Sequence, residues 1–155
     1  MAFDEAAVDT LFSRVQSHAM TLGYFDTVNT HEPKNAPGSD LTCSIWIQSI
    51  EPVGSVSGLA SASGLVVLFI RIYANMLQEP QDAIDPNMLK ATTTLLAGYA
   101  GDFDLGQTVR NIDLFGQVGP KLAAVAGYIN IDNRLYRAVT ITLPVILNDM
   151  WTEAG

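Results

Sequence analysis

Cysteine and histidine, side chains that often act as nucleophile, base or metal ligand, are nearly absent from this chain. Cys43 is the one cysteine among 155 residues, so no intrachain disulfide can form. The two histidines, His18 and His31, fall in a predicted helix and a predicted loop, and neither belongs to a catalytic sequence motif. A phosphate-binding glycine loop, a CxxC pair and an HExxH motif are also missing. We therefore expect neither an enzyme nor a site for a metal or cofactor.

Charge is also scarce, and its balance is acidic. Only 15% of the residues are charged, with eight basic against sixteen acidic side chains and a formal net charge of −8. Because nucleic-acid affinity rests largely on Lys and Arg neutralising phosphates, this balance argues against a surface that grips DNA. With 48% apolar residues the chain is predicted to be globular, and its uncharged surface favours self-association.

Carboxylates gather around the second predicted helix without the spacing of a calcium loop. They are Glu79, Asp82, Asp85, Asp102 and Asp104. The D-x-D-x-D-G pattern that brings carboxylates around Ca²⁺ is missing. We interpret them as helix caps and residues of solvated loops.

Long apolar runs and targeting signals are missing as well. The longest apolar run, Leu65–Ile70, is far below the ~20 residues of a membrane helix. The acidic start of the chain lacks the basic and apolar regions of a signal peptide, so we expect an intracellular protein without a membrane partner. The length predicts a single domain over residues 1–155 that buries roughly two thirds of its unfolded surface.

What the chain does contain is strong periodicity. A helix is predicted over residues 4–22, with Asp4 capping its first turn and Gly23 at its end. A second helix is predicted over residues 86–100 with Asp85 as its cap. Extended segments are predicted at residues 24–28, 41–50, 65–76 and 108–114. This order predicts an α+β fold, a mainly antiparallel sheet with two helices packed on it and a closing C-terminal hairpin.

That hairpin is predicted over residues 121–151, with its turn at Asp132 and Asn133. In its second segment the odd positions are almost all apolar: Leu135, Val139, Ile141, Leu143, Val145 and Leu147. Because alternate side chains of a strand point to opposite faces, this face should hold the helices. Arg137 is the charge on it, near the turn, where water reaches it.

The even face of the same segment is expected to point outward. Tyr136, Thr140 and Thr142 are then free to meet a neighbouring subunit. Pro144 cannot donate to a ladder, which predicts an edge strand or a bulge at that position. An edge beside a self-associating surface is where we expect a ring contact.

Residues 51–64, EPVGSVSGLASASG, are small and nearly uncharged, and predict a long loop that projects from the body and orders against a partner. The GSVSG run within it is not a nucleophile elbow, because Val56 occupies the position that requires serine. In the preceding strand Cys43 falls on the apolar face, as a buried thiol. Trp46 points the other way, and two alternatives stay open for what packs on it: a helix or a neighbouring subunit.

Three segments carry a resemblance to a known family: HEPKNAPGSDLTCSIWIQSIEPV, SGLASASGLVVLFIRIYANMLQEPQDAIDP and GYINIDNRLYRAVTITLPVILNDMW. Together they resemble the tail-terminator (tail-completion) proteins of long-tailed bacteriophages. The resemblance covers nearly the whole chain in element order, size and sequence pattern. It extends to head-closure and neck connector proteins of similar size.

The resemblance implies a virion protein that forms a closed ring, typically a hexamer, at the head-proximal end of the tail tube. Its expected partners are further copies of itself, the tail tube protein and the head-tail connector or neck protein. DNA passes through such a ring without specific binding. Two interpretations of the acidic excess stay open: an acidic lumen that repels phosphates, or simple solubility.

The predicted subunit interface consists of the 51–64 loop and four residues outside it. Its members are Trp46, Ser55, Ser57, Leu59, Arg71, Tyr73 and Tyr136. A core or solvent-facing role for Trp46, Arg71 and Tyr73 is equally open. A small hydrolase or ligand-binding domain is the remaining alternative, and it requires a pocket with converging polar groups.

Overall fold

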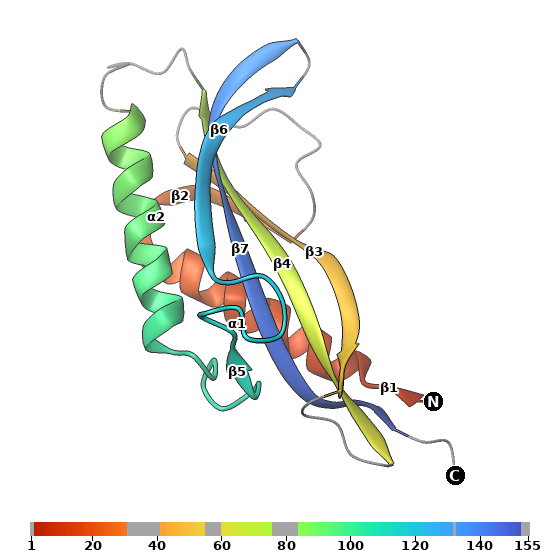
Figure 1. Cartoon of the computed structure of the whole chain (residues 1–155). Coiled ribbons are helices and arrows are strands. Elements are labelled where there is room, and N and C mark those ends of the chain that lie inside the picture. The colour runs from red at the N-terminus through yellow and green to blue at the C-terminus, as the bar shows by residue number, and fades with distance from the viewer. Residues whose placement is uncertain (1, 31–40, 55–59, 76–83, 132, 153–155) are drawn as a thin grey trace.

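The computed structural model describes residues 2–30, 41–54, 60–75, 84–131 and 133–152. A seven-stranded, mainly antiparallel sheet carries two helices on one of its faces (Figure 1). The predicted α+β class is therefore confirmed. The elements follow the order β1 (Ala2–Phe3), α1 (Glu5–Leu22), β2 (Phe25–Asn29), β3 (Leu41–Val53), β4 (Ser61–Asn75), α2 (Ile84–Gly101), β5 (Asn111–Ile112), β6 (Ala123–Ile131) and β7 (Arg134–Thr152).

The first helix begins and ends where its sequence predicts. The Asp4 side chain accepts a hydrogen bond from the Ala7 N–H, as an N-cap should. Gly23 closes the helix in the left-handed conformation, which costs glycine nothing. The second helix begins at Ile84, so Asp85 lies within it and not before it; the side chain of Asp85 is outside the described residues.

β7 is the strand on which the sheet is built. One of its edges pairs with β4 over nearly its whole length. Its other edge pairs in turn with β6, β5 and β1. β3 then joins β4, and the short β2 adds in parallel at the far edge. The predicted hairpin is present as β6 and β7, and Asn133 in its turn has a φ of +62°.

Pro144 shows why the expected edge or bulge at that position is wrong. It pairs with Val67 of β4 in the interior of the sheet. Its carbonyl, which points to the other side, accepts from the Asp113 N–H at 2.9 Å. In a strand the N–H and C=O of one residue point the same way, so the missing N–H falls between the ends of β6 and β5, where no ladder bond is lost.

The main core lies between the helices and one face of the sheet, and the odd face of β7 contributes to it as expected. Fully buried members come from both helices, β3, β4 and β7: Leu11, Val15, Ala19, Cys43, Ile45, Leu68, Ile70, Ile72, Leu95, Tyr99, Ile141 and Leu143. Burying each of the valine, leucine and isoleucine side chains among them contributes on the order of 1.5–3 kcal/mol. The Tyr99 hydroxyl donates to the Val15 carbonyl at 3.0 Å and so ties the two helices together.

A second, smaller core covers the lower half of the opposite face. Leu65, Val67 and Ile146 are buried there, and Val118 packs against them from the connection between β5 and β6. Gly119 in the same connection approaches so closely that a Cβ would lie 2.5 Å from Leu65 Cδ2. The chain itself therefore covers the second face of β4 in this region.

Three extended segments differ from their predicted lengths. β3 and β4 continue into the region expected as a long loop, because Glu51 pairs with Leu65 and Val53 with Ser63. The strand expected at residues 108–114 shrinks to β5, Asn111–Ile112. Turns and bends occupy residues 102–110 ahead of it, and Leu105 and Gln107 among them have positive φ. No helix in the described part of the chain is long and apolar enough to cross a membrane.

Candidate assembly surface

The edge strand β6 is the first element of the candidate surface. Among the described strands it pairs with β7 alone, so its other edge carries backbone N–H and C=O groups without a ladder partner from them. Such an edge is a template for adding a further chain unless something covers it. Most of its side chains are exposed or half-buried, in contrast to those of β4.

Exposed apolar side chains surround this strand on the side that the helices occupy. Leu89 on α2 is 64% exposed, Tyr128 on β6 is 57% exposed and Leu135 on β7 is 52% exposed. The register places Tyr128 opposite Arg137, on the face of β7 that holds the helices. These large exposed apolar side chains make this the candidate surface for contact with another protein.

Between α2 and the hairpin lies an open groove of about 500 Å³, which we call the α2–β6 groove. It is lined by Pro86, Met88, Leu89 and Thr92 of α2, Ala124 and Ala126 of β6, and Arg137 and Val139 of β7. The groove exists because the strands extend past the helix and because their residues opposite it are alanines, which leave space. Its volume lies in the range of about 300–1,000 Å³ that takes a sizeable group.

Thr92 lines this groove, but its hydroxyl oxygen is enclosed by neighbouring atoms. Its side chain is 6% exposed, and its Oγ1 has no hydrogen-bond partner among the described residues. A helical threonine usually donates back to a carbonyl one turn earlier, as Thr93 and Thr94 do to Leu89 and Lys90. A buried hydroxyl without a partner costs roughly 1–3 kcal/mol of stability.

Arg137 is the charged side chain among the described lining residues. Its guanidinium lies 4.7 Å from the centre of the Tyr128 ring, and its Nη1 donates to the Gly127 carbonyl at 3.1 Å. These contacts hold the cation along the groove wall at a half-buried position. Arg137 therefore adds a fixed positive charge to a mostly apolar groove.

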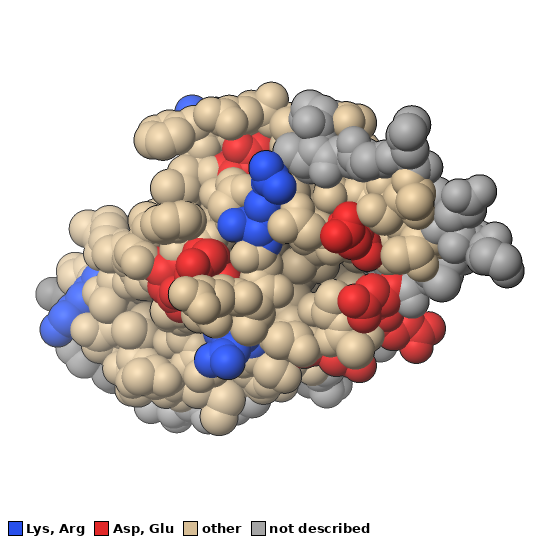
Figure 2. All heavy atoms as spheres, turned by 90° about the horizontal axis from the view of Figure 1, so that it is seen from below, with Lys and Arg blue, Asp and Glu red and all other residues tan. Residues whose placement is uncertain are grey.

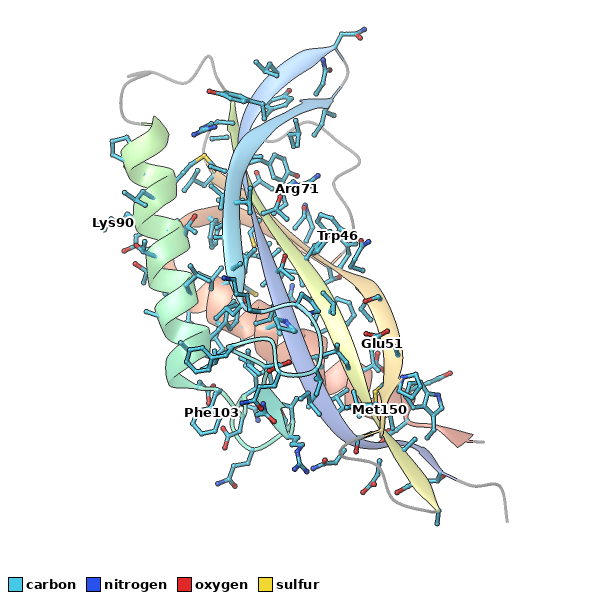
Figure 3. All side chains as sticks on the ribbon, viewed as in Figure 1. Trp46, Glu51, Arg71, Lys90, Phe103 and Met150 are labelled. Atoms are coloured by element: carbon cyan, nitrogen blue, oxygen red, sulfur yellow. The ribbon has the colours of Figure 1, made fainter. Side chains whose placement is uncertain are left out.

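A second, mixed patch lies on the opposite face of the sheet. The Trp46 and Phe69 rings meet edge to face with centres 5.9 Å apart, and the Arg71 guanidinium lies 5.3 Å from the Trp46 ring (Figure 3). Arg71 Nε also donates to Thr140 Oγ1 at 3.1 Å. Both helices pack on the other face, so a helix does not cover Trp46; Trp46 and Arg71 are half-buried.

The other predicted interface residues fall elsewhere. Tyr73 and Tyr136 are each 1% exposed, and the Tyr73 hydroxyl lies 3.4 Å from Ser44 Oγ. The expectation that Tyr136 faces outward is therefore wrong: its face is the predicted one, but that face is covered at this end of the sheet. Ser55, Ser57 and Leu59 lie outside the described residues.

One polar contact escaped the sequence analysis. His18 Nε2 of α1 lies 2.8 Å from Asp102 Oδ2, just beyond the end of α2, and the His18 ring meets the Tyr99 ring at 5.3 Å. The hydrogen bond to His18, followed by the Gly106 N–H, lowers the pKa of Asp102. Eighty-four residues separate the pair in the sequence, and no local spacing connects them.

No protein-family model matches the chain, and no curated protein matches its sequence. Its structure is similar to a chain in a solved structure described as "Virion of native gene transfer agent (GTA) particle", with a TM-score of 0.41 and 10% sequence identity over 94% of this chain and 99% of that one. Similarity at this level carries no argument about fold or function.

Proposed function

We propose that this chain is a structural virion protein, a tail terminator that forms a ring on the head-proximal end of a phage tail tube. Bound there, the ring ends tube polymerisation and offers the docking surface for the head connector. The sequence resemblance supplies the class of protein, and the exposed apolar surface around β6 supports self-assembly. That surface is the observation that carries the proposal: Leu89, Tyr128 and Leu135 are each more than half exposed beside an open strand edge.

A ring built from identical contacts needs two different faces on each subunit, because a head-to-tail interface joins unlike patches. The hairpin side of the molecule offers one such patch. The turn just after α2 offers another, with exposed Phe103. The low charge of the chain fits this role, since interfaces that bury apolar surface are depleted of charge at their centre.

Electron microscopy of the purified protein is the first test. We expect rings with a central hole, and their symmetry gives the number of subunits, which we propose to be six. The functional test uses phage lysates in which the gene for this chain is disrupted. Tails of uncontrolled length are expected there, and tails of normal length would rule out a terminator.

The neck connector is the second candidate, because the same self-associating surface serves it equally. Labelled virions distinguish the two. A terminator lies directly on the last ring of the tail tube, whereas a connector lies on the head side of that ring. Disruption of a connector gene leaves complete tails that do not join heads.

A further inference from the structure

We propose that the open edge of β6 pairs with the β6 strand of a second copy of this chain, which joins the two sheets into one. The two strands run antiparallel, and the two-fold axis between them passes at Gly127. The inference goes beyond the proposed ring and does not rest on it. A two-fold contact uses the same patch on both copies and stops at two, whereas a ring requires unlike patches.

The hydrogen bonds of β7 show which backbone groups of β6 point away from the sheet. The Pro144 carbonyl accepts from the Asp113 N–H on the edge of β7 that also pairs with β6. Since no register shift interrupts β7 from Tyr136 to Leu147, its even-numbered residues point toward β6. The register matches them with odd-numbered residues of β6. The even-numbered residues of β6 therefore direct their N–H and C=O groups outward: Ala124, Ala126, Tyr128 and Asn130.

The two sides of the sheet differ in how they resist a further strand. On the far side, β3 pairs with β2 only through residues 41–44. Beyond them β3 has a register shift between Ile47 and Ser49, followed by Glu51 and Pro52. A bulge, a charge and a proline all discourage the pairing of an edge. β6 contains neither charge nor proline, and its pairing with β7 has no register shift, so this nine-residue strand is open to a partner.

The side chains of β6 fit an antiparallel copy of the same strand. With Gly127 at the two-fold axis, Val125 lies opposite Ile129 of the second copy, and two β-branched side chains pair well across strands. On the other face Tyr128 lies opposite Ala126 of the second copy, so a large ring meets a small side chain. Val125 and Tyr128 are 69% and 57% exposed in the single chain, and the pairing removes part of this apolar surface from water.

Charge favours a second copy over a different protein. Residues 122–131 include no charged side chain, although the whole chain has a net charge of −8. Two copies that meet through this stretch place no like charges opposite each other, an arrangement that destabilises strand pairs. A different protein that relies on charge for recognition finds no group to select on this strand. An uncharged strand that matches itself in size therefore points to its own copy as the partner.

A cysteine at the two-fold position tests the pairing in the full chain. Gly127→Cys fits the strand, because a Cβ at this position meets no atom within 4 Å. In the proposed pair it faces its counterpart at a non-hydrogen-bonded position, with Cα atoms about 4.5 Å apart, which suits a disulfide. We expect diamide to convert this protein into disulfide-linked pairs on a non-reducing gel. The native Cys43 is buried and should not contribute.

Val125→Cys is the matched control. This position is well exposed, but in the proposed register it lies about 14 Å from Val125 of the second copy, too far for a disulfide. The Val125→Cys protein should therefore link only at background level by itself. Mixed with an Ile129→Cys protein, it should form linked pairs of the two, because these positions face each other.

Ala126→Pro gives a second measurement without a cross-link. The Ala126 N–H points outward, so proline removes a bond to the second copy and none to β7. By symmetry two such bonds are lost from each pair, and the concentration at which pairs dissociate should rise about tenfold or more in sedimentation experiments.

Two outcomes overturn the inference: linkage of Gly127→Cys no faster than that of Val125→Cys, or a folded Ala126→Pro protein that pairs as tightly as the wild type. Either result leaves the proposed function standing. Tail length in lysates without this chain tests that function separately.

Discussion

At the scale of single residues, the contact of His18 with Asp102 makes the packing of the two helices depend on pH. The hydrogen bond from His18 comes first among the interactions that lower the pKa of Asp102 below its ordinary 3.8, followed by that from the Gly106 N–H. A carboxyl group with a lowered pKa in the folded state adds stability above its unfolded pKa. It loses that stability as the pH falls through the folded pKa.

Asp102→Asn should therefore lower the free energy of unfolding near neutral pH by roughly 0.2–1 kcal/mol. The value is small because both partners are partly exposed and water screens the pair. The difference from wild type should be present above about pH 5 and close as the solution is acidified. Urea unfolding across this pH range measures it, with Asp9→Asn on the exposed side of α1 as the control. A difference that persists unchanged in acid would contradict this account.

Cys43 provides a second test at this scale. Burial raises the pKa of its thiol from 9.0 to about 12, and the side chain is fully buried between the sheet and the helices. Since the thiolate is the reactive form, we expect a maleimide to label the folded protein very slowly at neutral pH. Labelling should become rapid in urea, which mass spectrometry follows directly. Rapid labelling of the native protein would show that the core opens far more readily than its packing indicates.

At the scale of elements, the turn at Gly116 holds the connection that covers the second core. Gly116 has a φ of +69°, and a Cβ there would lie 2.8 Å from the Gly119 carbonyl oxygen. Gly116→Ala should lower the free energy of unfolding by roughly 1–3 kcal/mol, because both the backbone conformation and the space require glycine. Thermal or urea denaturation gives the value.

Gly127→Ala is the matched control for that substitution. Gly127 lies in β6, and a Cβ there would meet no atom within 4 Å. Its replacement should leave stability unchanged or raise it by up to about 1 kcal/mol, since alanine loses less entropy than glycine in a strand. Equal losses for the two variants would show that the Gly116 turn has no special requirement.

Helices and strands could be predicted from the sequence where side-chain periodicity is strong. The caps at Asp4 and Gly23 and the odd apolar face of β7 were all predicted correctly, because each depends on neighbours a few residues away. The ends of β3 and β4 were not. Glu51–Val53 and Ser61–Gly64 have the composition of a loop, and they are strands because they pair with each other and with β7.

Alternation also predicts a face but not what covers it. Tyr136 lies on the predicted side of β7, beside Asn75 and on the same face as Tyr73, yet it is buried. The α2–β6 groove is hidden from the sequence for the same reason. Its walls come from three elements whose nearness depends on how α2 crosses the sheet, and the missing bond at Thr92 becomes visible only in three dimensions.

At the scale of the whole molecule, charge is sparse and unevenly placed. Figure 2, which views the end opposite the hairpin turn, shows mostly uncharged surface on which acidic and basic side chains are scattered. With a net charge of −8, the chain should repel duplex DNA rather than hold it. We expect no retardation of DNA by the purified protein at about 0.1 M salt.

A gel-shift titration over a range of salt concentrations checks this expectation. A cationic variant in which surface acids are replaced by lysine should bind, with an affinity that falls as salt rises. Binding by the wild-type protein with the same salt dependence would contradict the idea that DNA passes this protein freely.

The position of β7 in the chain has a consequence for synthesis. Its partners β1, β4, β5 and β6 all precede it in sequence, and Ala2 pairs with Thr152. While the ribosome is still translating residues before Arg134, only β2, β3 and β4 among the described strands can pair with one another. The pairings with β7 join segments that are far apart in the sequence, and such pairings form late. A nascent chain interrupted there has neither β7 nor the wall that β7 gives to the groove. We therefore expect translation fragments that end before Arg134 to lack both a complete sheet and a complete groove.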